Sequence, residues 1–272
     1  MDAGTIRKGI KLNAKRQFFS YMLPCIGVAL LDSIITTLFS LILSGRMPDA
    51  QTLLTAEDLT VYWPQIAQIY GLTLAFSLLI SPLTVGSYAF FNEVYAGKRP
   101  PFTSVFAWLG EGKKVAAAYK ANLWYLLITV KYVLLFLVPA SALFVGAGYL
   151  LDGSLSFAAA TLYFLAFLLW AASAVAAYAY INAYAPALYM IAANPDLGTR
   201  ATFQFCRQVM KKRVWEFFLF RLTFLGWELL GMITFGIGVF FVTPYVNLST
   251  AGYTQYVKAE TFRALTTEGT QT

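Results

Sequence analysis

The chain has 272 residues, of which 59% are hydrophobic, 17% aromatic and only 12% charged. Soluble domains carry about 25% charged residues, so this composition excludes an ordinary soluble protein and indicates a polytopic membrane protein. The sequence also contains no histidine, which removes the commonest metal ligand and the commonest general base.

Apolar runs long enough to cross a bilayer follow one another along the chain. A hydrocarbon core of about 30 Å needs roughly 20 apolar residues per helix, and only helices or a closed barrel satisfy the backbone there. The runs are too long and too continuous for the alternating strands of a barrel. We therefore expect a single all-α membrane domain over 1–272, with six spans in three hairpins at about 18–96, 119–193 and 215–258.

The distribution of basic residues predicts the orientation. All but three of the 20 Lys and Arg residues fall in the N-terminal segment, in the connections after the second and fourth expected spans, or in the tail. The opposite side carries Arg46 together with Asp49, Glu57, Asp58 and Asp152. The positive-inside rule therefore places both termini in the cytoplasm. The net charge of +7 indicates attraction to the anionic lipids of the inner leaflet and no nucleic-acid binding.

One basic connection also has the pattern of an amphipathic helix. Between Thr199 and Phe217, apolar residues recur every three or four positions, and Arg, Lys and Gln occupy the other face. This predicts a helix lying in the membrane interface, with Lys211, Lys212 and Arg213 in contact with lipid. A helix that binds an unidentified protein partner is the alternative. Weaker patterns of the same kind occur at 6–18 and 102–114.

The three expected hairpins share an order of features. In each, a basic segment runs into aromatic residues, and the returning helix carries a proline followed by small and polar residues; these prolines are Pro82, Pro186 and Pro244. A true repeat would pack with pseudo-threefold symmetry around a central path, with the helices kinked at the prolines. Chance similarity is the alternative, because aromatic belts and prolines are common in membrane helices.

We place four ionisable residues of the expected spans inside the hydrocarbon core: Asp32, Lys131, Arg221 and Glu228. A charge near the bilayer centre costs at least about 2.5 kcal/mol and should find a partner. The two acids and Lys131 have similar expected depths, so we expect Lys131 to pair with one or both, whereas Arg221 is close enough to the inner headgroups to reach them. The cluster is interpreted as a structural ion pair or, alternatively, as a cavity for an ion or a polar headgroup.

A more specific pattern lies between Phe203 and Tyr256. A Met-Lys pair leads into a Phe-rich helix that ends near Gly-Trp, and Gly-Ile-Gly, Pro-Tyr and a Thr-Ala-x-Tyr close follow; the positions are Met210, Lys211, Gly226, Trp227, Gly236 to Gly238, Pro244, Tyr245 and Thr250 to Tyr253. This order resembles the C-terminal signature of an uncharacterised bacterial integral-membrane family, domain of unknown function nine hundred seventy-five. The resemblance implies a bacterial plasma-membrane protein without an established activity. A looser similarity to the membrane domains of glycerophosphodiester phosphodiesterases implies a lipid-adjacent setting.

Catalytic motifs are not found in the sequence. There is no GxSxG, no HExxH and no phosphate loop, and no extramembrane stretch is long enough for a catalytic domain. We therefore expect no enzyme, no cofactor and no metal site. Two functions remain open: a non-enzymatic scaffold or accessory membrane component, or a small transporter, channel or lipid-handling protein that uses a central polar cluster between kinked helices.

Overall fold

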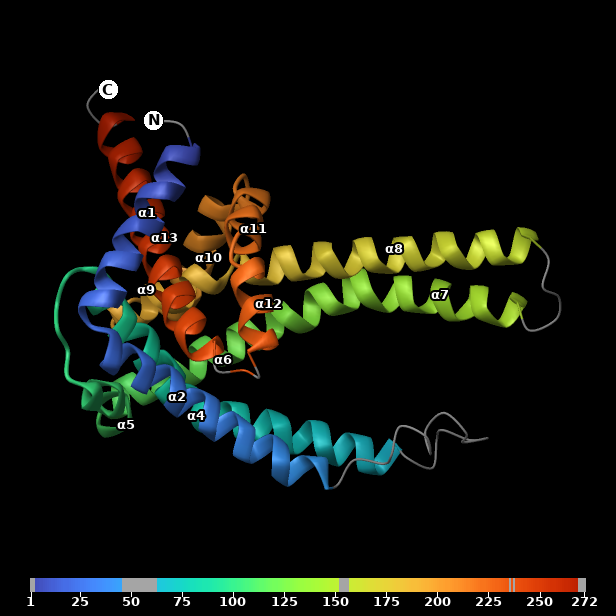
Figure 1. Cartoon of the computed structure of the whole chain (residues 1–272), viewed down its shortest axis with the longest axis horizontal. Coiled ribbons are helices and arrows are strands. Elements are labelled where there is room, and N and C mark those ends of the chain that lie inside the picture. Colours follow the sequence, from blue (N-terminus) through green and yellow to red (C-terminus); the bar gives the residue numbers. More distant parts are fainter. Residues whose placement is uncertain (1–2, 46–62, 152–156, 235, 237, 269–272) are drawn as a thin grey trace.

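The helices divide into two long arms and a body from which both arms extend (Figure 1). The computed structural model describes residues 3–45, 63–151, 157–234, 236 and 238–268. Every element in these ranges is helical, which confirms the all-α prediction. The expected outer loops, with Arg46, Glu57 and Asp152, lie outside the described residues.

The first arm pairs α2 (Met22–Ser44) with α4 (Trp63–Tyr95). The rings of Phe39 and Phe76 stack between the two helices with centroids 3.6 Å apart. The second arm pairs α7 (Val138–Leu151) with α8 (Phe157–Asn182), and Phe144 packs on Tyr163 at 4.7 Å. Helix α6 (Gly112–Tyr132) leads into α7 through one π-helical turn, Val133–Leu137.

Four helical stretches are long and apolar enough to cross a membrane: Met22–Ser44, Ala67–Tyr95, Gly112–Gly148 and Ala160–Ala193. Their large apolar side chains project outward over much of their length, and Leu23, for example, is 78% exposed. Apolar surface on this scale is unfavourable in water but is solvated by lipid tails. The described chain is therefore membrane-embedded through at least these helices.

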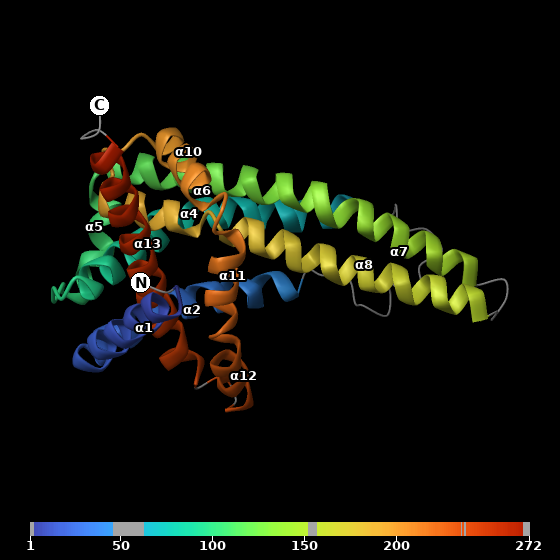
Figure 2. The same cartoon turned by 90° about the horizontal axis from the view of Figure 1, so that it is seen from above.

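The third expected hairpin is built differently. It consists of α11 (Val214–Leu222), α12 (Leu225–Ile233) and α13 (Val239–Glu268), and none of these is among the four apolar stretches. Two views show α11 and α12 running crosswise to α7 and α8 at the base of the arms (Figures 1 and 2). A nine-residue helix is about 14 Å long, less than half the hydrocarbon thickness. Neither six spans nor a third arm is confirmed.

A backbone interruption at Thr223 and Phe224 separates α11 from α12. The Thr223 hydroxyl donates to the Phe220 carbonyl at 2.6 Å, and side-chain hydrogen bonds of this kind to the preceding turn bend helices. The Thr223 side chain also contacts Lys11 of α1 (Ala3–Ser20). Gly236, with φ of +84°, adopts the left-handed conformation that glycine tolerates best. It lies in the connection between α12 and α13.

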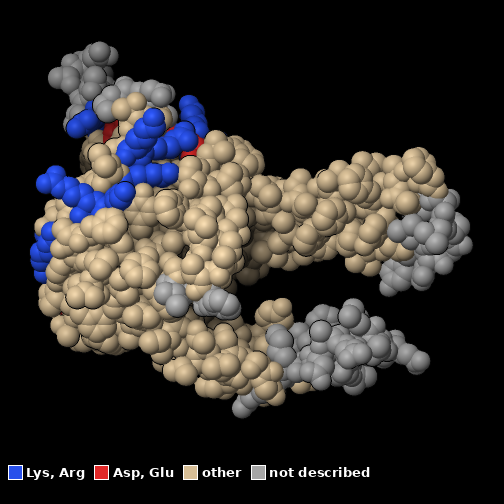
Figure 3. Space-filling model, viewed as in Figure 1, with Lys and Arg blue, Asp and Glu red and all other residues tan. Residues whose placement is uncertain are grey.

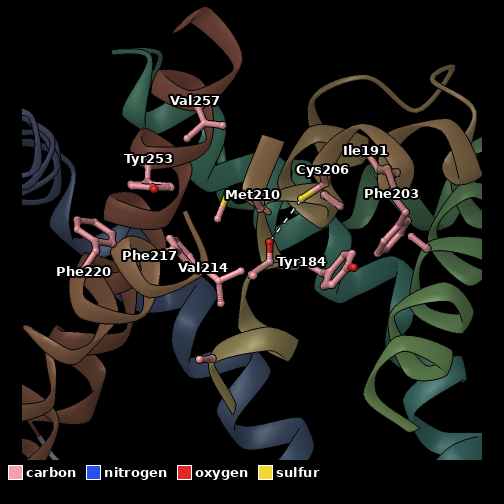
Figure 4. Close-up of a cluster of buried hydrophobic side chains, with 14 of the residues drawn as sticks. Tyr184, Ile191, Phe203, Cys206, Met210, Val214, Phe217, Phe220, Tyr253 and Val257 are labelled. Atoms are coloured by element: carbon pink, nitrogen blue, oxygen red, sulfur yellow. Dashed lines mark hydrogen bonds between the residues drawn. The ribbon is translucent and has the colours of Figure 1, made fainter. Parts of the chain in front are cut away.

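The body is held by a core of aromatic rings (Figure 4). Phe217 and Phe220 of α11 pack on the fully buried Tyr253 of α13, with centroids 4.9 and 5.2 Å apart. The remaining helices of the body are α5 (Ala107–Gly110), α9 (Ala185–Ala193), α10 (Thr199–Met210) and the 3₁₀ helix Phe102–Phe106. Burying such large rings supplies the main apolar stabilisation of the body.

Only one of the three predicted kink prolines coincides with a break between helices. Pro186 lies in the first turn of α9, after the α8 helix has ended at Asn182. Pro82 and Pro244 lie inside α4 and α13, which continue past them. Side chains of α6 and α4 cross-link the backbone near Pro82: Asn122 donates to the Ser77 carbonyl at 3.0 Å, and Ser81 donates to the Ala118 carbonyl at 2.8 Å. These two hydrogen bonds join α4 to α6 beside Pro82.

Candidate functional site

Helix α10 confirms the predicted amphipathic pattern, but its apolar face does not rest on lipid. That face is buried against the protein and comprises Thr199, Thr202, Phe203, Cys206 and Met210. The Phe203 ring stacks on Trp124 of α6 and on Tyr184, each at 6.4 Å. The earlier expectation fails because periodicity shows that one face is covered without showing whether lipid or protein covers it.

Cys206 fixes α10 at the junction of α8 and α9. Its Sγ atom donates to the Ala183 carbonyl at 3.5 Å (Figure 4), and the side chain is fully buried. Burial raises the pKa of this thiol to about 12, because the thiolate would lose its hydration. Cys206 and the equally buried Cys25 are both free thiols.

A basic groove lies where α10 meets α6, lined by Lys131, Arg200, Arg207 and Lys211. The groove consists of two adjoining hollows of about 330 Å³ each, which share Lys131, Arg207 and the rings of Tyr132 and Tyr184. The aromatic wall is continuous, with Tyr132 at 6.2 Å from Tyr184. None of the described residues that line the two hollows is acidic.

The predicted pairing of Lys131 with Asp32 or Glu228 is not formed. The described residues contain three ion pairs, Lys98–Glu93, Lys114–Glu111 and Arg213–Glu260. Lys131 is exposed on α6 and lies over the Tyr132 ring at 5.3 Å. Asp32 belongs to the other arm, and Glu228 is half-buried in the first turn of α12. Similar depth along separate helices therefore did not imply proximity.

The three predicted lipid-contact residues differ in their surroundings. Lys211 and Lys212 are exposed at the end of α10. Arg213 is half-buried, and its Nη1 and Nη2 atoms donate to the two carboxylate oxygens of Glu260 at 2.7 and 2.8 Å. Arg213 is thus bound within the protein, and only the two lysines remain available to lipid.

Asp32 and Arg221 belong to a second cluster of polar residues, which we call the polar centre. It comprises Asp32, Ser87, Tyr88, Tyr189, Arg221, Asn247 and Thr250. The rings of Tyr88 and Tyr189 stack at 4.5 Å, and the Tyr189 hydroxyl donates to Asn247 Oδ1 at 3.2 Å. The Arg221 guanidinium donates to Thr250 at 3.4 Å, while Ser87 lies beside Asp32. Both charged groups are close enough to act electrostatically on the tyrosine pair.

The polar centre forms where the three segments that follow the prolines meet. Helices α4, α9 and α13 pack on one another in pairs and supply Tyr88, Tyr189 and Asn247. Hydrogen bonds continue the contact: Asn92 donates to the Tyr189 carbonyl at 2.7 Å, and Gln255 donates to the Asn92 carbonyl at 3.3 Å. The small and polar residues after each proline were the sequence signal for this convergence.

Sequence reasoning missed that Arg200 and Arg207 face Lys131. Their spacing with Gln204 and Lys211 puts all four on one face of α10, so their common side was predictable. The packing partner on α6 was not, because no pattern in α6 distinguishes the side that faces α10. Among the described residues, no group of three or more Cys, Asp or Glu side chains could hold a metal ion.

Comparison with known proteins gives a family and no activity. The family model described as "Protein of unknown function (DUF975)" matches residues 17–261. No curated protein and no solved structure matches the chain.

Proposed function

The chain belongs to the DUF975 family, whose description assigns no activity, and from its own residues we propose that it is a non-enzymatic scaffold or accessory protein of the bacterial plasma membrane. One observation carries the proposal: charge and apolar surface are separated along the molecule. Lys and Arg gather at the end that bears both termini, and the described parts of the arms show none on the same face (Figure 3). A molecule with this separation is suited to anchoring its apolar arms in lipid while its basic end binds the anionic lipids of the inner leaflet.

The orientation follows from the same separation. The basic end belongs in the cytoplasm by the positive-inside rule. Four crossings put both termini on that side, as the six predicted crossings would. The fifth and sixth crossings would require α11, α12 and α13 to run through the bilayer, and their crosswise course favours four.

The polar centre supports a second candidate, a small transporter or lipid-handling protein. Asp32 and Arg221 carry charge beside the half-buried Tyr88 and the buried Tyr189, at the junction of several helices. Ionisable groups inside membrane domains commonly mark substrate or ion paths. We favour the scaffold because the hydrogen bonds of Tyr189 to Asn247 and of Arg221 to Thr250 join these helices to one another, which suits a structural network.

Reconstitution in nanodiscs tests the scaffold proposal. The protein should melt at a higher temperature in discs containing phosphatidylglycerol than in discs of phosphatidylcholine alone. The variant Lys211→Glu/Lys212→Glu should lose most of this gain and still melt like the wild type in phosphatidylcholine. Equal melting of the wild type in both lipids would contradict the proposal. Transfer of a fluorescent lipid between leaflets that depends on Asp32 would support the second candidate instead.

A further inference from the structure

We propose that the basic groove between α6 and α10 binds the phosphate headgroup of one anionic phospholipid. This inference rests on the proposed association with the anionic leaflet and deepens it, because it replaces diffuse attraction by a defined site. The carrying observation is the meeting of Lys131, Arg200, Arg207 and Lys211 around two adjoining hollows.

Charge complementarity identifies the chemistry of the occupant. Four basic side chains converge and no described lining residue is acidic, so like charges face one another without a counter-ion from the lining. A phosphodiester accepts charge-assisted hydrogen bonds from several Arg and Lys donors at once. It would relieve the repulsion that the four cations otherwise impose on α6 and α10.

The surroundings of the groove identify a lipid as the carrier of the phosphate. Trp124, Tyr132 and Tyr184 line the groove, and tryptophan and tyrosine prefer the level of lipid headgroups. Leu127 lines the groove as well, and the apolar side chains of Leu127, Leu134 and Leu135 are exposed along α6 and the π turn. They offer a path for acyl chains next to the headgroup site.

The π-helical turn is a second mark of a functional position. It begins at Val133, directly after Lys131 and Tyr132. Such turns are rare and occur often at functional sites. Tyr132, directly before the turn, stacks on Tyr180 at 5.3 Å, and Phe136, within the turn, stacks on the same ring at 5.6 Å. This packing fixes the side of α6 from which Lys131 projects.

Native mass spectrometry of the full chain, released from nanodiscs containing phosphatidylglycerol, tests the site. We expect one retained phosphatidylglycerol on the wild type. Each basic side chain that contacts the headgroup should strengthen binding about fivefold, so Lys131→Met/Arg207→Gln should weaken retention about 25-fold. The matched control Lys8→Met/Arg16→Gln removes the same charges from exposed positions of α1 and should retain the lipid.

The outcomes separate this proposal from the general one. Equal retention by the groove variant and the control, while phosphatidylglycerol still raises the melting temperature of the wild type, would overturn the groove and leave the scaffold standing. A wild type without any phosphatidylglycerol dependence would overturn both. The charge-preserving variant Lys131→Arg/Arg207→Lys should retain the lipid. Displacement of the lipid by millimolar glycerol phosphate would show a site for soluble phosphate esters and overturn the lipid assignment.

Discussion

Arg213, at the start of α11, and Glu260, near the end of α13, are joined by two parallel hydrogen bonds of 2.7 and 2.8 Å. The contact ties the turn after α10 to the C-terminal helix across 47 positions of sequence. The guanidinium also lies over the Tyr256 ring at 6.0 Å. This pair therefore links the element that carries the basic groove to the aromatic core of the body.

Removing either partner of this pair should destabilise the body. Arg213→Gln and Glu260→Gln should each lower the free energy of unfolding by about 1 kcal/mol, because a two-point pair exceeds an ordinary surface pair while solvent still screens it. The double variant should cost less than the sum of the single losses. Thermal melting in one detergent measures all three. Lys212→Gln is the matched control and should stay within about 0.5 kcal/mol of wild type; strict additivity would contradict the coupling.

The same pair predicts a dependence of stability on pH. Hydrogen bonds from the Arg213 guanidinium lower the pKa of Glu260 from 4.5 to about 2. The folded state therefore binds fewer protons than the unfolded state, and the stabilisation is fully present above pH 4.5 and is lost as the pH falls towards 2. The difference in melting temperature between wild type and Glu260→Gln should shrink across this window. A difference that stayed constant would show that the charge of Glu260 contributes nothing.

The long apolar helices and the two-faced α10 were predictable because both are local properties of the sequence. Length and composition predict a span, and spacing predicts a face. The third hairpin is not confirmed as two spans. An apolar run in the sequence looks the same whether its helix is continuous or interrupted, and the hydrogen bond from Thr223 to the Phe220 carbonyl is visible only in the structure. The site of Lys131 was mispredicted because depth along a helix does not specify which neighbour its side chain meets.

Gly86 of α4 predicts a sharp limit on side-chain size. A Cβ atom there would overlap the carbonyl oxygen of Val105, which belongs to backbone and cannot rotate away. Gly86→Ala should therefore destabilise the protein by about 1–3 kcal/mol. Gly71→Ala, in the same helix with nothing within 4 Å of the added Cβ, should be neutral or stabilising by up to about 1 kcal/mol. Similar melting temperatures for the two variants would contradict the close approach of α4 to the 3₁₀ helix.

Cysteine labelling tests the orientation, and the native thiols suit the experiment. Cys25 and Cys206 are fully buried, and burial raises the pKa of Cys206 to about 12, so the reactive thiolate is scarce at neutral pH. The unmodified protein should react weakly with a membrane-impermeant maleimide in intact cells. Ser44→Cys and Phe157→Cys, at exposed positions near the arm tips, should react.

Lys113→Cys tests the opposite side of the membrane, because Lys113 is exposed at the start of α6, at the basic end of the molecule. It should resist the reagent in intact cells and react after the membrane is permeabilised, since the positive-inside rule predicts that this end lies in the cytoplasm. The result also bears on the number of crossings. An even number of crossings keeps both termini on one side of the membrane, whereas an odd number would separate them. A cysteine at Lys8 in α1 and one at Lys258 in α13 should therefore both be protected in intact cells. Labelling of either from outside would overturn the orientation and, with it, the assignment of the basic groove to the inner leaflet.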